Sequence, residues 1–398
     1  MPQNNTFCVL PWMHVATTPG GSYRVCCNSN SKNNKLKLDG AQLKVNKHGY
    51  QELHKSETLQ EIRRQMLAGE RPDTCSRCFS QEDAGVRSSR EIYNEVWADE
   101  REYKQDDEIV PRYIDLRLGN MCNLKCRMCN PYSSDQWVKE WEEIHGAFPE
   151  DEHNWLTNMN WPEYSGTDKH LKEMMSSVEE IYFTGGEPTI IKRHDQLLDY
   201  CIEHDLAKNI RLKYNTNLTN VPVRLIEKWE HFKHLRLNCS IDGIGALNDY
   251  IRYPSKWRGI SKNYKRVLDI DASNRVVDIH TTVQVTNILH LHKFIEHFVR
   301  PRDEVTEEVV PFVFFNILDR PDYLNIRILP NLLKQLVQER LEPWVGHPDL
   351  EQLQGVLDYM WSENWYDKWP EFVSHTHQLD AMRSQSLEDV APEFKGWL

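Results

Sequence analysis

The chain has 398 residues, enough for one large domain with additions or for two to three ordinary domains. Only 39% of the residues are hydrophobic, but 13 Trp, 16 Tyr and 12 Phe supply bulky core material, which argues against a disordered chain. The formal net charge of -12 argues against nucleic acid as a partner, because nucleic-acid binding needs a concentrated basic surface.

The cysteines are clustered along the chain. The N-terminus has no signal-peptide pattern and no window approaches the roughly eighteen apolar residues of a membrane span, so we expect a cytoplasmic protein without a membrane segment. In that compartment the 10 cysteines are free, catalytic or metal-bound. All but Cys201 and Cys239 fall into two groups, which are Cys8, Cys26, Cys27, Cys75 and Cys78, and then Cys122, Cys126 and Cys129.

Residues 1–80 hold the first cysteine group. "CVLPWMHVATTPGGSYRVCC" places Cys8 and Cys26 on either side of a Gly-containing turn, and "CSRC" adds Cys75 and Cys78. A hairpin followed by C-x-x-C is a common way to bring four thiolates to one metal site. Cys27 is the alternative to Cys26 as the second of these four ligands. By itself the pattern favours a structural zinc site that holds a core-poor segment together.

The pattern changes after residue 109. Residues 81–109 are highly charged and predict an exposed helix and linker. Six strand candidates then alternate with helical stretches, at 113–119, 178–186, 209–217, 235–243, 276–287 and 309–318. This alternation predicts a parallel α/β architecture. The long first connection (130–177) predicts inserted helices, and residues 321–398 predict a helical C-terminal region.

The stretch "MCNLKCRMCNP" places Cys122, Cys126 and Cys129 just after the first predicted strand. The C-terminal ends of the strands are where parallel α/β folds build active sites. Three thiolates in a short loop suit an iron–sulfur or zinc site. A set that is one ligand short leaves an open metal position for a substrate or cofactor, as catalytic sites do. The alternative is a closed site whose fourth ligand is Cys201, Cys239 or a histidine.

Polar turns end the next three predicted strands. "YFTGGEPTI" ends the second strand, where two glycines let the backbone approach a ligand and Glu187 adds an acceptor. "NTN" ends the third strand with Asn215, and "SIDG" ends the fourth with Ser240 and Asp242. Arg252 follows shortly and offers a bidentate contact to a carboxylate. The alternative is ordinary turn chemistry, since Asn, Ser, Asp and Gly are common turn residues.

The order of these motifs resembles that of the radical SAM superfamily, with "CNLKCRMC" after the first strand and "GGEP" after the second. The resemblance implies a partial (β/α)6 TIM-like barrel over residues 110–320. It also implies a 4Fe-4S cluster held by the catalytic residues Cys122, Cys126 and Cys129, whose fourth iron is chelated by S-adenosylmethionine (SAM). One electron from the cluster then cleaves SAM to a 5′-deoxyadenosyl radical, which abstracts hydrogen from a substrate.

The same resemblance implies the contacts to SAM. In the family G-G-E-P binds the SAM amino group, which here corresponds to Gly185, Gly186, Glu187 and Pro188. Polar residues at later strand ends contact the ribose or carboxylate, which implies Asn215, Ser240, Asp242 and Arg252. The family usually has an aromatic residue before the third cysteine, packed near the adenine. This sequence departs from that pattern with Met128, whose polarizable thioether can fill the same role.

The N-terminal cysteine pattern resembles the twitch domain, a shortened SPASM domain that follows the barrel in better-known relatives and here precedes it. The resemblance implies a second, auxiliary 4Fe-4S cluster for electron relay or substrate positioning. Its ligands would be Cys8, Cys26, Cys75 and Cys78. We therefore expect a twitch-like module (1–80), a charged helical linker (81–109), a radical SAM partial barrel (110–320) and a helical C-terminal region (321–398).

The expected function is that of a radical SAM enzyme that modifies a peptide or protein, with a flavodoxin- or ferredoxin-like electron donor as partner. One alternative is a radical SAM enzyme acting on a sugar, aminoglycoside or nucleoside-like small molecule. An alternative of another class is a non-catalytic iron–sulfur or zinc-binding protein for electron transfer or interaction. Such a carrier needs neither the three-cysteine loop nor the "GGEP" turn.

Overall fold

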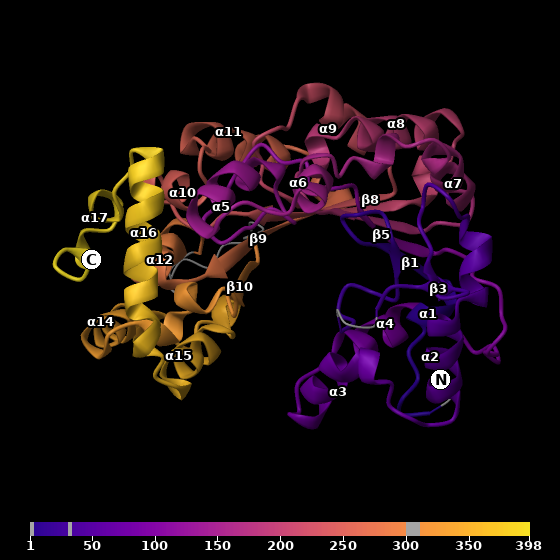
Figure 1. Ribbon diagram of the computed structural model, residues 1–398, viewed down its shortest axis with the longest axis horizontal. Coiled ribbons are helices and arrows are strands. Elements are labelled where there is room, and N and C mark those ends of the chain that lie inside the picture. The colour runs from indigo at the N-terminus through magenta and orange to yellow at the C-terminus, as the bar shows by residue number, and fades with distance from the viewer. Residues whose placement is uncertain (1–3, 31–33, 300–310) are drawn as a thin grey trace. The chain divides into compact units, whose positions relative to one another are not determined.

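The computed structural model describes residues 4–30, 34–299 and 311–398 (Figure 1). The packing of the backbone divides the chain into two units. Unit 1 contains Met1–Met121, Asn158–Tyr214 and Glu227–Leu235, and unit 2 contains Cys122–Thr157, Asn215–Ile226 and Arg236–Leu398. Each unit therefore combines segments that are far apart in the sequence, and the four-part division expected from the sequence stays a prediction. None of the described helices has the length and apolar character needed to cross a membrane.

A mainly parallel sheet forms the core of unit 1. Its strand order is β7-β6-β5-β1-β2, with β1 (His14–Thr17), β2 (Tyr23–Arg24), β5 (Tyr113–Arg117), β6 (Glu180–Thr184) and the first part of β7 (Arg211–Thr216). The pairs β1/β5, β5/β6 and β6/β7 are parallel, whereas β1 and β2 form an antiparallel hairpin. The predicted α/β architecture with a parallel sheet is thus confirmed. The N-terminal hairpin between Cys8 and Cys26 adds β1 and β2 to this sheet, a placement that the sequence did not predict.

One face of this sheet is apolar. Ile114 pairs with Ile181 and Leu116 with Phe183, so these side chains share a face. Helices α7 (Thr167–Met174) and α8 (Lys192–Glu203) belong to the same unit (Figure 1). His194 of α8 stands edge-on to Phe183. The strict alternation that predicted the first strand therefore reflects burial of this face.

The N-terminal part of unit 1 has its own apolar centre, in which the rings of Phe7, Trp12 and Tyr103 pack together. The fully buried Arg63 donates hydrogen bonds to the carbonyl oxygen of Pro11 and to two later carbonyls. The elements are α1 (Leu10–Met13), β3 (Lys37–Leu38), β4 (Ala41–Gln42), α2 (Glu57–Leu67), α3 (Ser76–Asp83) and α4 (Ser89–Trp97).

Unit 2 contains the other strands of the predicted series. Their order is β10-β9-β8, with the part of β8 (His234–Ser240) from Arg236 onward, β9 (Arg275–Val283) and β10 (Val313–Ile317). Strands β9 and β10 are parallel. The sixth predicted strand covered residues 309–318, of which 309 and 310 lie outside the described residues. The helices around these strands are α5 (Val138–His145), α6 (Glu150–Thr157), α10 (Ala246–Ile251), α11 (Trp257–Leu268), α12 (Val285–Ile288) and α13 (Leu291–Phe298).

The long connection after the first predicted strand carries inserted helices, as predicted, namely α5, α6 and α7. Helix α9 (Val223–Trp229) contains residues of both units. The elements after residue 321 are helices, the longest of which are α14 (Asn331–Leu341), α15 (Leu353–Ser362), α16 (Trp369–Arg383) and α17 (Leu387–Val390), drawn in orange to yellow in Figure 1.

We predict that Phe183→Ala destabilises unit 1 by about 3–5 kcal/mol, because a fully buried aromatic ring is removed and leaves a cavity. The measurement is the midpoint of urea unfolding. Val96→Ala is the control, because Val96 is 58% exposed in the same unit and its truncation should change stability by less than about 0.5 kcal/mol. Equal midpoints for the two variants would contradict the role of this face as the core.

Candidate functional site

The three-cysteine loop lies in unit 2. Cys126 is 5% exposed, and Cys122 and Cys129 are half-buried. The loop turns tightly, since the Cys129 N–H donates to the Cys126 carbonyl at 2.9 Å and the Leu124 N–H donates to Cys122 Sγ at 3.4 Å. The thiols of Cys126 and Cys129 are hydrogen-bonded to each other. The structure therefore brings the predicted ligands of this loop together.

The main chain of this loop is fixed by distant residues of the same unit. The Lys125 N–H donates to the Tyr253 carbonyl at 2.7 Å, and the Arg127 N–H donates to the Ile251 carbonyl at 2.8 Å. Trp137 Nε1 donates to the Cys126 carbonyl at 2.9 Å. Because backbone groups without water need such partners, these bonds determine the path of the loop.

Ion pairs attach the same loop to the C-terminal helix α16. Arg127 Nη2 lies 2.5 Å from Asp380 Oδ1. Glu140 pairs both with Lys125 and with Arg383, whose Nη2 lies 2.6 Å from Glu140 Oε2. These groups are mostly buried, so removing one partner would leave an uncompensated charge.

The electrostatic surroundings favour a thiolate at Cys126. The hydrogen bond from Cys129 lowers the pKa of Cys126 and raises that of Cys129, and the positive charge of Arg252 acts on both thiols. Because the thiolate is the form that binds a metal, this donor set fits the iron–sulfur cluster implied by the sequence.

Two of the predicted SAM-contacting residues form a buried ion pair beside this loop. Arg252 Nε lies 2.7 Å from Asp242 Oδ2, and the carboxylate of Asp242 also accepts from the Thr282 N–H at 2.7 Å. Burial raises the pKa of Asp242 and the charge of Arg252 opposes that effect. Arg252 is thus held by a carboxylate while its charge acts on the cysteines.

The other predicted SAM-contacting residues of unit 2 are not part of this ion pair. Asn215 Oδ1 accepts from Asn238 at 2.8 Å, and Met128 and Ser240 are half-buried. The next asparagine in "NTN", Asn217, places its Nδ2 4.0 Å from Cys122 Sγ. Asn217 is not among the residues predicted from the sequence to contact SAM, although its place in the same strand-end motif was a signal.

The "GGEP" turn lies in unit 1 and folds back on the end of the chain segment that precedes the cysteines. The Glu187 N–H donates to the Met121 carbonyl at 2.9 Å. Gly185 and Gly186 have φ values of +79° and +55°. A Cβ atom on Gly186 would lie 2.1 Å from the Met121 carbonyl oxygen, so only glycine fits. The carboxylate of Glu187 is buried and accepts from the hydroxyl and N–H of Thr189.

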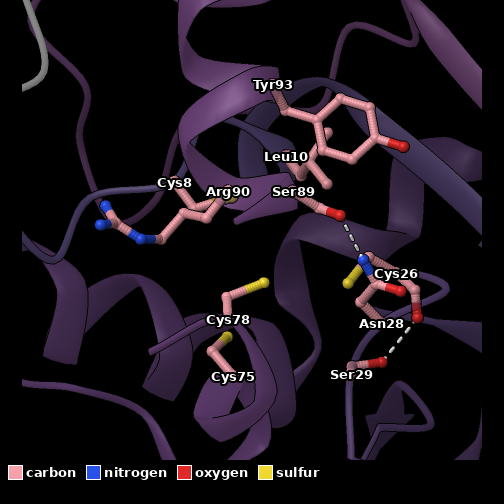
Figure 2. A pocket seen from close by; sticks show the side chains of 10 residues that line it. All are labelled: Cys8, Leu10, Cys26, Asn28, Ser29, Cys75, Cys78, Ser89, Arg90 and Tyr93. Atoms are coloured by element: carbon pink, nitrogen blue, oxygen red, sulfur yellow. Dashed lines mark hydrogen bonds between the residues drawn. The ribbon is translucent and has the colours of Figure 1, made fainter. Parts of the chain in front are cut away.

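The four predicted auxiliary ligands line one pocket in unit 1. Figure 2 shows the sulfur atoms of Cys26 and Cys78 pointing toward each other across it. Cys8 precedes α1, Cys26 follows β2, Cys75 ends a short helix and Cys78 lies in α3. The structure therefore brings to one pocket thiols that are up to about seventy residues apart in sequence, and soft sulfur donors are the ligands that an iron–sulfur cluster prefers.

Residues Ser89, Arg90 and Tyr93 of helix α4 also line this pocket. Arg90 binds Glu82 through two nitrogen atoms, at 2.9 and 2.6 Å, and Asn28 Nδ2 donates to Ser89 Oγ at 2.6 Å (Figure 2). Burial raises the pKa of Cys26 to about 12. Such thiols become thiolates when a metal takes the proton's place. Over the described ranges, no group of three or more His, Cys, Asp or Glu side chains converges closely enough to hold one metal ion.

Cys27 does not line the pocket. Burial raises its pKa, and the charges that act on it are those of Asp115, Arg24 and Arg117. Of the two rival cysteines, Cys26 is therefore the one that faces the other three.

We predict that Gly186→Ala opens the "GGEP" turn, because its Cβ cannot coexist with the Met121 carbonyl. The measurement is hydrogen exchange at the Glu187 amide, which should be at least about tenfold faster. Gly69→Ala is a matched control, since Gly69 also has a positive φ of +78° but has no atom within 4 Å of the added carbon. Unchanged exchange in Gly186→Ala would contradict this account of the turn.

Residues 116–298 match the family model described as Radical SAM superfamily. No curated protein matches the sequence. Among solved structures, the chain is similar to Streptococcus suis SuiB bound to precursor peptide SuiA, at 18% identity over 60% of this chain and 41% of that chain, with a TM-score of 0.30. It is also similar to anSMEcpe with bound AdoMet and Cp18Cys peptide, at 13% identity over 62% of this chain and 61% of that chain, with a TM-score of 0.37.

The chain thus spans between 41% and 61% of the length of these two solved structures. The family match lies over the three-cysteine loop, the "GGEP" turn and strands β6 to β9. A radical SAM domain implies a 4Fe-4S cluster and SAM, and the residues described above fit the cluster. The match over residues 116–298 supports a radical SAM domain in this part of the chain, and with it an enzyme.

Proposed function

We propose that this enzyme reductively cleaves SAM and abstracts hydrogen from a peptide or protein substrate. The observation that carries the proposal is the three-cysteine loop within the matched domain, whose thiols are brought together and lie in the field of Arg252. When bound, a 4Fe-4S cluster with SAM supplies the electron and the 5′-deoxyadenosyl radical. The protein supplies the ligands and the orientation.

Cys122, Cys126 and Cys129 are the proposed cluster ligands. The loop holds them in one orientation because its main chain bonds Ile251 and Tyr253 and its Arg127 pairs with Asp380. Arg252 lowers the pKa of Cys126 and opposes the rise at Cys129. This positive charge also offsets part of the negative charge of a cluster bound by three thiolates.

The residues that the family resemblance implies for SAM keep that role in the proposal. The backbone of the "GGEP" turn and the carboxylate of Glu187 would take the amino group. The Nε of Arg252 is engaged by Asp242, so its terminal nitrogens would take the SAM carboxylate. The proposed further contacts are Met128, Gly185, Gly186, Pro188, Asn215, Ser240 and Asp242.

The pocket of unit 1 is the proposed auxiliary 4Fe-4S site, with Cys8, Cys26, Cys75 and Cys78 as its ligands in a twitch-like module. Its role is electron relay or substrate positioning. The alternative that the sequence left open is a structural zinc site with the same four thiols as ligands. Analysis of the bound metal distinguishes a zinc site from an iron–sulfur cluster. The proposed (β/α)6 TIM-like barrel is supported by the parallel strands and by the family match.

A peptide or protein is the proposed substrate, and a flavodoxin- or ferredoxin-like protein is the proposed electron donor. SuiB and anSMEcpe were each solved with a peptide, which is a property of those proteins. The alternative within the same chemistry is a sugar, aminoglycoside or nucleoside-like small molecule. The radical SAM domain sets aside the non-catalytic alternative.

We predict that the protein, reconstituted with iron and sulfide without oxygen and then reduced, converts SAM to 5′-deoxyadenosine. The triple variant Cys122→Ala, Cys126→Ala, Cys129→Ala should form none and should lose about half of the iron, because one of two clusters is lost. Chromatography and iron analysis measure both quantities. Cys201→Ala is the control, since this buried thiol lies in neither cysteine group. A reconstituted wild type that does not cleave SAM would refute the proposal.

We predict that the auxiliary site depends on Cys26 and not on Cys27, because only Cys26 lines the pocket. Each Cys→Ala change is introduced into the triple variant, so that the auxiliary site alone holds iron. Cys26→Ala should lose most of the remaining iron, whereas Cys27→Ala should retain it. Iron and sulfide analysis is the measurement, and the reverse pattern would assign the ligand to Cys27.

A further inference from the structure

The second face of the unit 1 sheet carries charged and polar side chains where an apolar surface is usual. Asp115 of β5 pairs with Tyr182 of β6, which pairs with Lys213 of β7, so the three residues form one row across the sheet. Arg117 is the next residue of β5 on the same face. Strands of parallel sheets are normally apolar on both faces. This face is therefore built for something other than helix packing.

Asp115 is the centre of this charged group. It is 0% exposed, and its Oδ2 lies 2.9 Å from Nη2 of Arg24, a residue of β2 that is 7% exposed. The other oxygen of Asp115, the Nε of Arg24 and the Nε of Arg117 are buried and have no hydrogen-bond partner among the described residues. Buried polar atoms are rarely left without a partner, and three of them in one group indicate a missing polar ligand.

The charge of the group indicates the sign of that ligand. Burial raises the pKa of Asp115, and the charges of Arg24, Arg117 and Lys213 oppose that rise. The two guanidinium groups of Arg24 and Arg117 therefore face one carboxylate, which leaves a positive surplus. Guanidinium groups bind carboxylate and phosphate through paired hydrogen bonds. Because Asp115 repels a doubly charged phosphate more than a singly charged carboxylate, the carboxylate fits better.

The group lies where a ligand can reach it. Arg117, Tyr182 and Lys213 are half-buried. Arg117 also ends β5, on the side of the sheet where parallel α/β folds bind ligands. A Cβ atom on Gly185 would lie 3.1 Å from the Cβ of Arg117, so the group adjoins the "GGEP" turn.

We propose that Arg24, Asp115 and Arg117 form a site that binds a carboxylate group of the substrate. The inference rests on the proposed function only in assigning the ligand to the substrate. It narrows the substrate to a molecule with a carboxylate, which for a peptide is an acidic side chain or a free C-terminus. Asp115 holds Arg24 in place through their ion pair. Arg117, which is half-buried, donates to the substrate carboxylate from the more exposed side.

The test uses propionate and its neutral analogue propionamide as probes, titrated by ligand-observed NMR into the iron-reconstituted full chain. Propionate should bind, and propionamide should not. Arg117→Gln should weaken propionate binding at least about tenfold, because a charge-assisted contact is lost. Arg64→Gln is the matched control, since it removes an exposed charge of α2 that pairs with Glu61 and Glu70, and it should leave binding unchanged.

Asp115→Asn should change the affinity for propionate in the opposite direction to Arg117→Gln. Removing the negative charge should tighten propionate binding several-fold, because the repulsion disappears while the cations stay. Circular dichroism and iron content show whether this buried change is tolerated. If the variant does not fold, the Arg117→Gln result still decides the question.

Three results would overturn the assignment: equal binding of propionate and propionamide, unchanged binding in Arg117→Gln, or competition between SAM and propionate. Competition, together with weaker SAM binding in Arg117→Gln, would assign the site to the SAM carboxylate. Failure of the proposed function appears separately, as a wild type that binds propionate but forms no 5′-deoxyadenosine.

Discussion

The contact between the Met121 carbonyl and the Gly186–Glu187 turn is the constraint on which the arrangement of the motifs depends. It joins the end of β6 to the residue that directly precedes Cys122. The approach is so close that any side chain at position 186 would collide with the carbonyl oxygen. The pairing of β5 with β6 and this turn together fix the position of Met121 within unit 1. The "GGEP" motif, which the sequence suggests as a ligand site, therefore also forms a close backbone contact that the fold needs.

The cysteine loop depends on residues far along the chain. Arg127 reaches Asp380 and Lys125 shares Glu140 with Arg383, so helix α16 holds the loop through buried charges. The C-terminal helices lie outside the family match. Their contacts nonetheless show a structural reason for their presence, because a loop of three thiols needs a rigid support to keep its ligands in one orientation.

Cys26 and Cys27 illustrate how adjacent residues serve different environments. A turn begins at Cys27, and here Cys26 faces the pocket of thiols while the charges of Arg24, Asp115 and Arg117 act on Cys27. The proposed auxiliary site and the proposed carboxylate site thus both adjoin the short segment that contains β2 and these two cysteines. If both proposals hold, the auxiliary site borders the region that receives the substrate.

The sequence by itself determined the six strands, the inserted helices, the three-cysteine loop and the "GGEP" turn, because strand alternation and motif spacing are local properties. It also identified Cys8, Cys26, Cys75 and Cys78 as a set, but left Cys27 as a rival. Only the tertiary structure showed that β1 joins the parallel sheet and that Asn217 approaches Cys122. It alone paired Arg24 with Asp115, 91 residues away, and Arg127 with Asp380, 253 residues away. No local pattern marks such pairs, because a buried charge finds its partner through the fold and not through its neighbours in sequence.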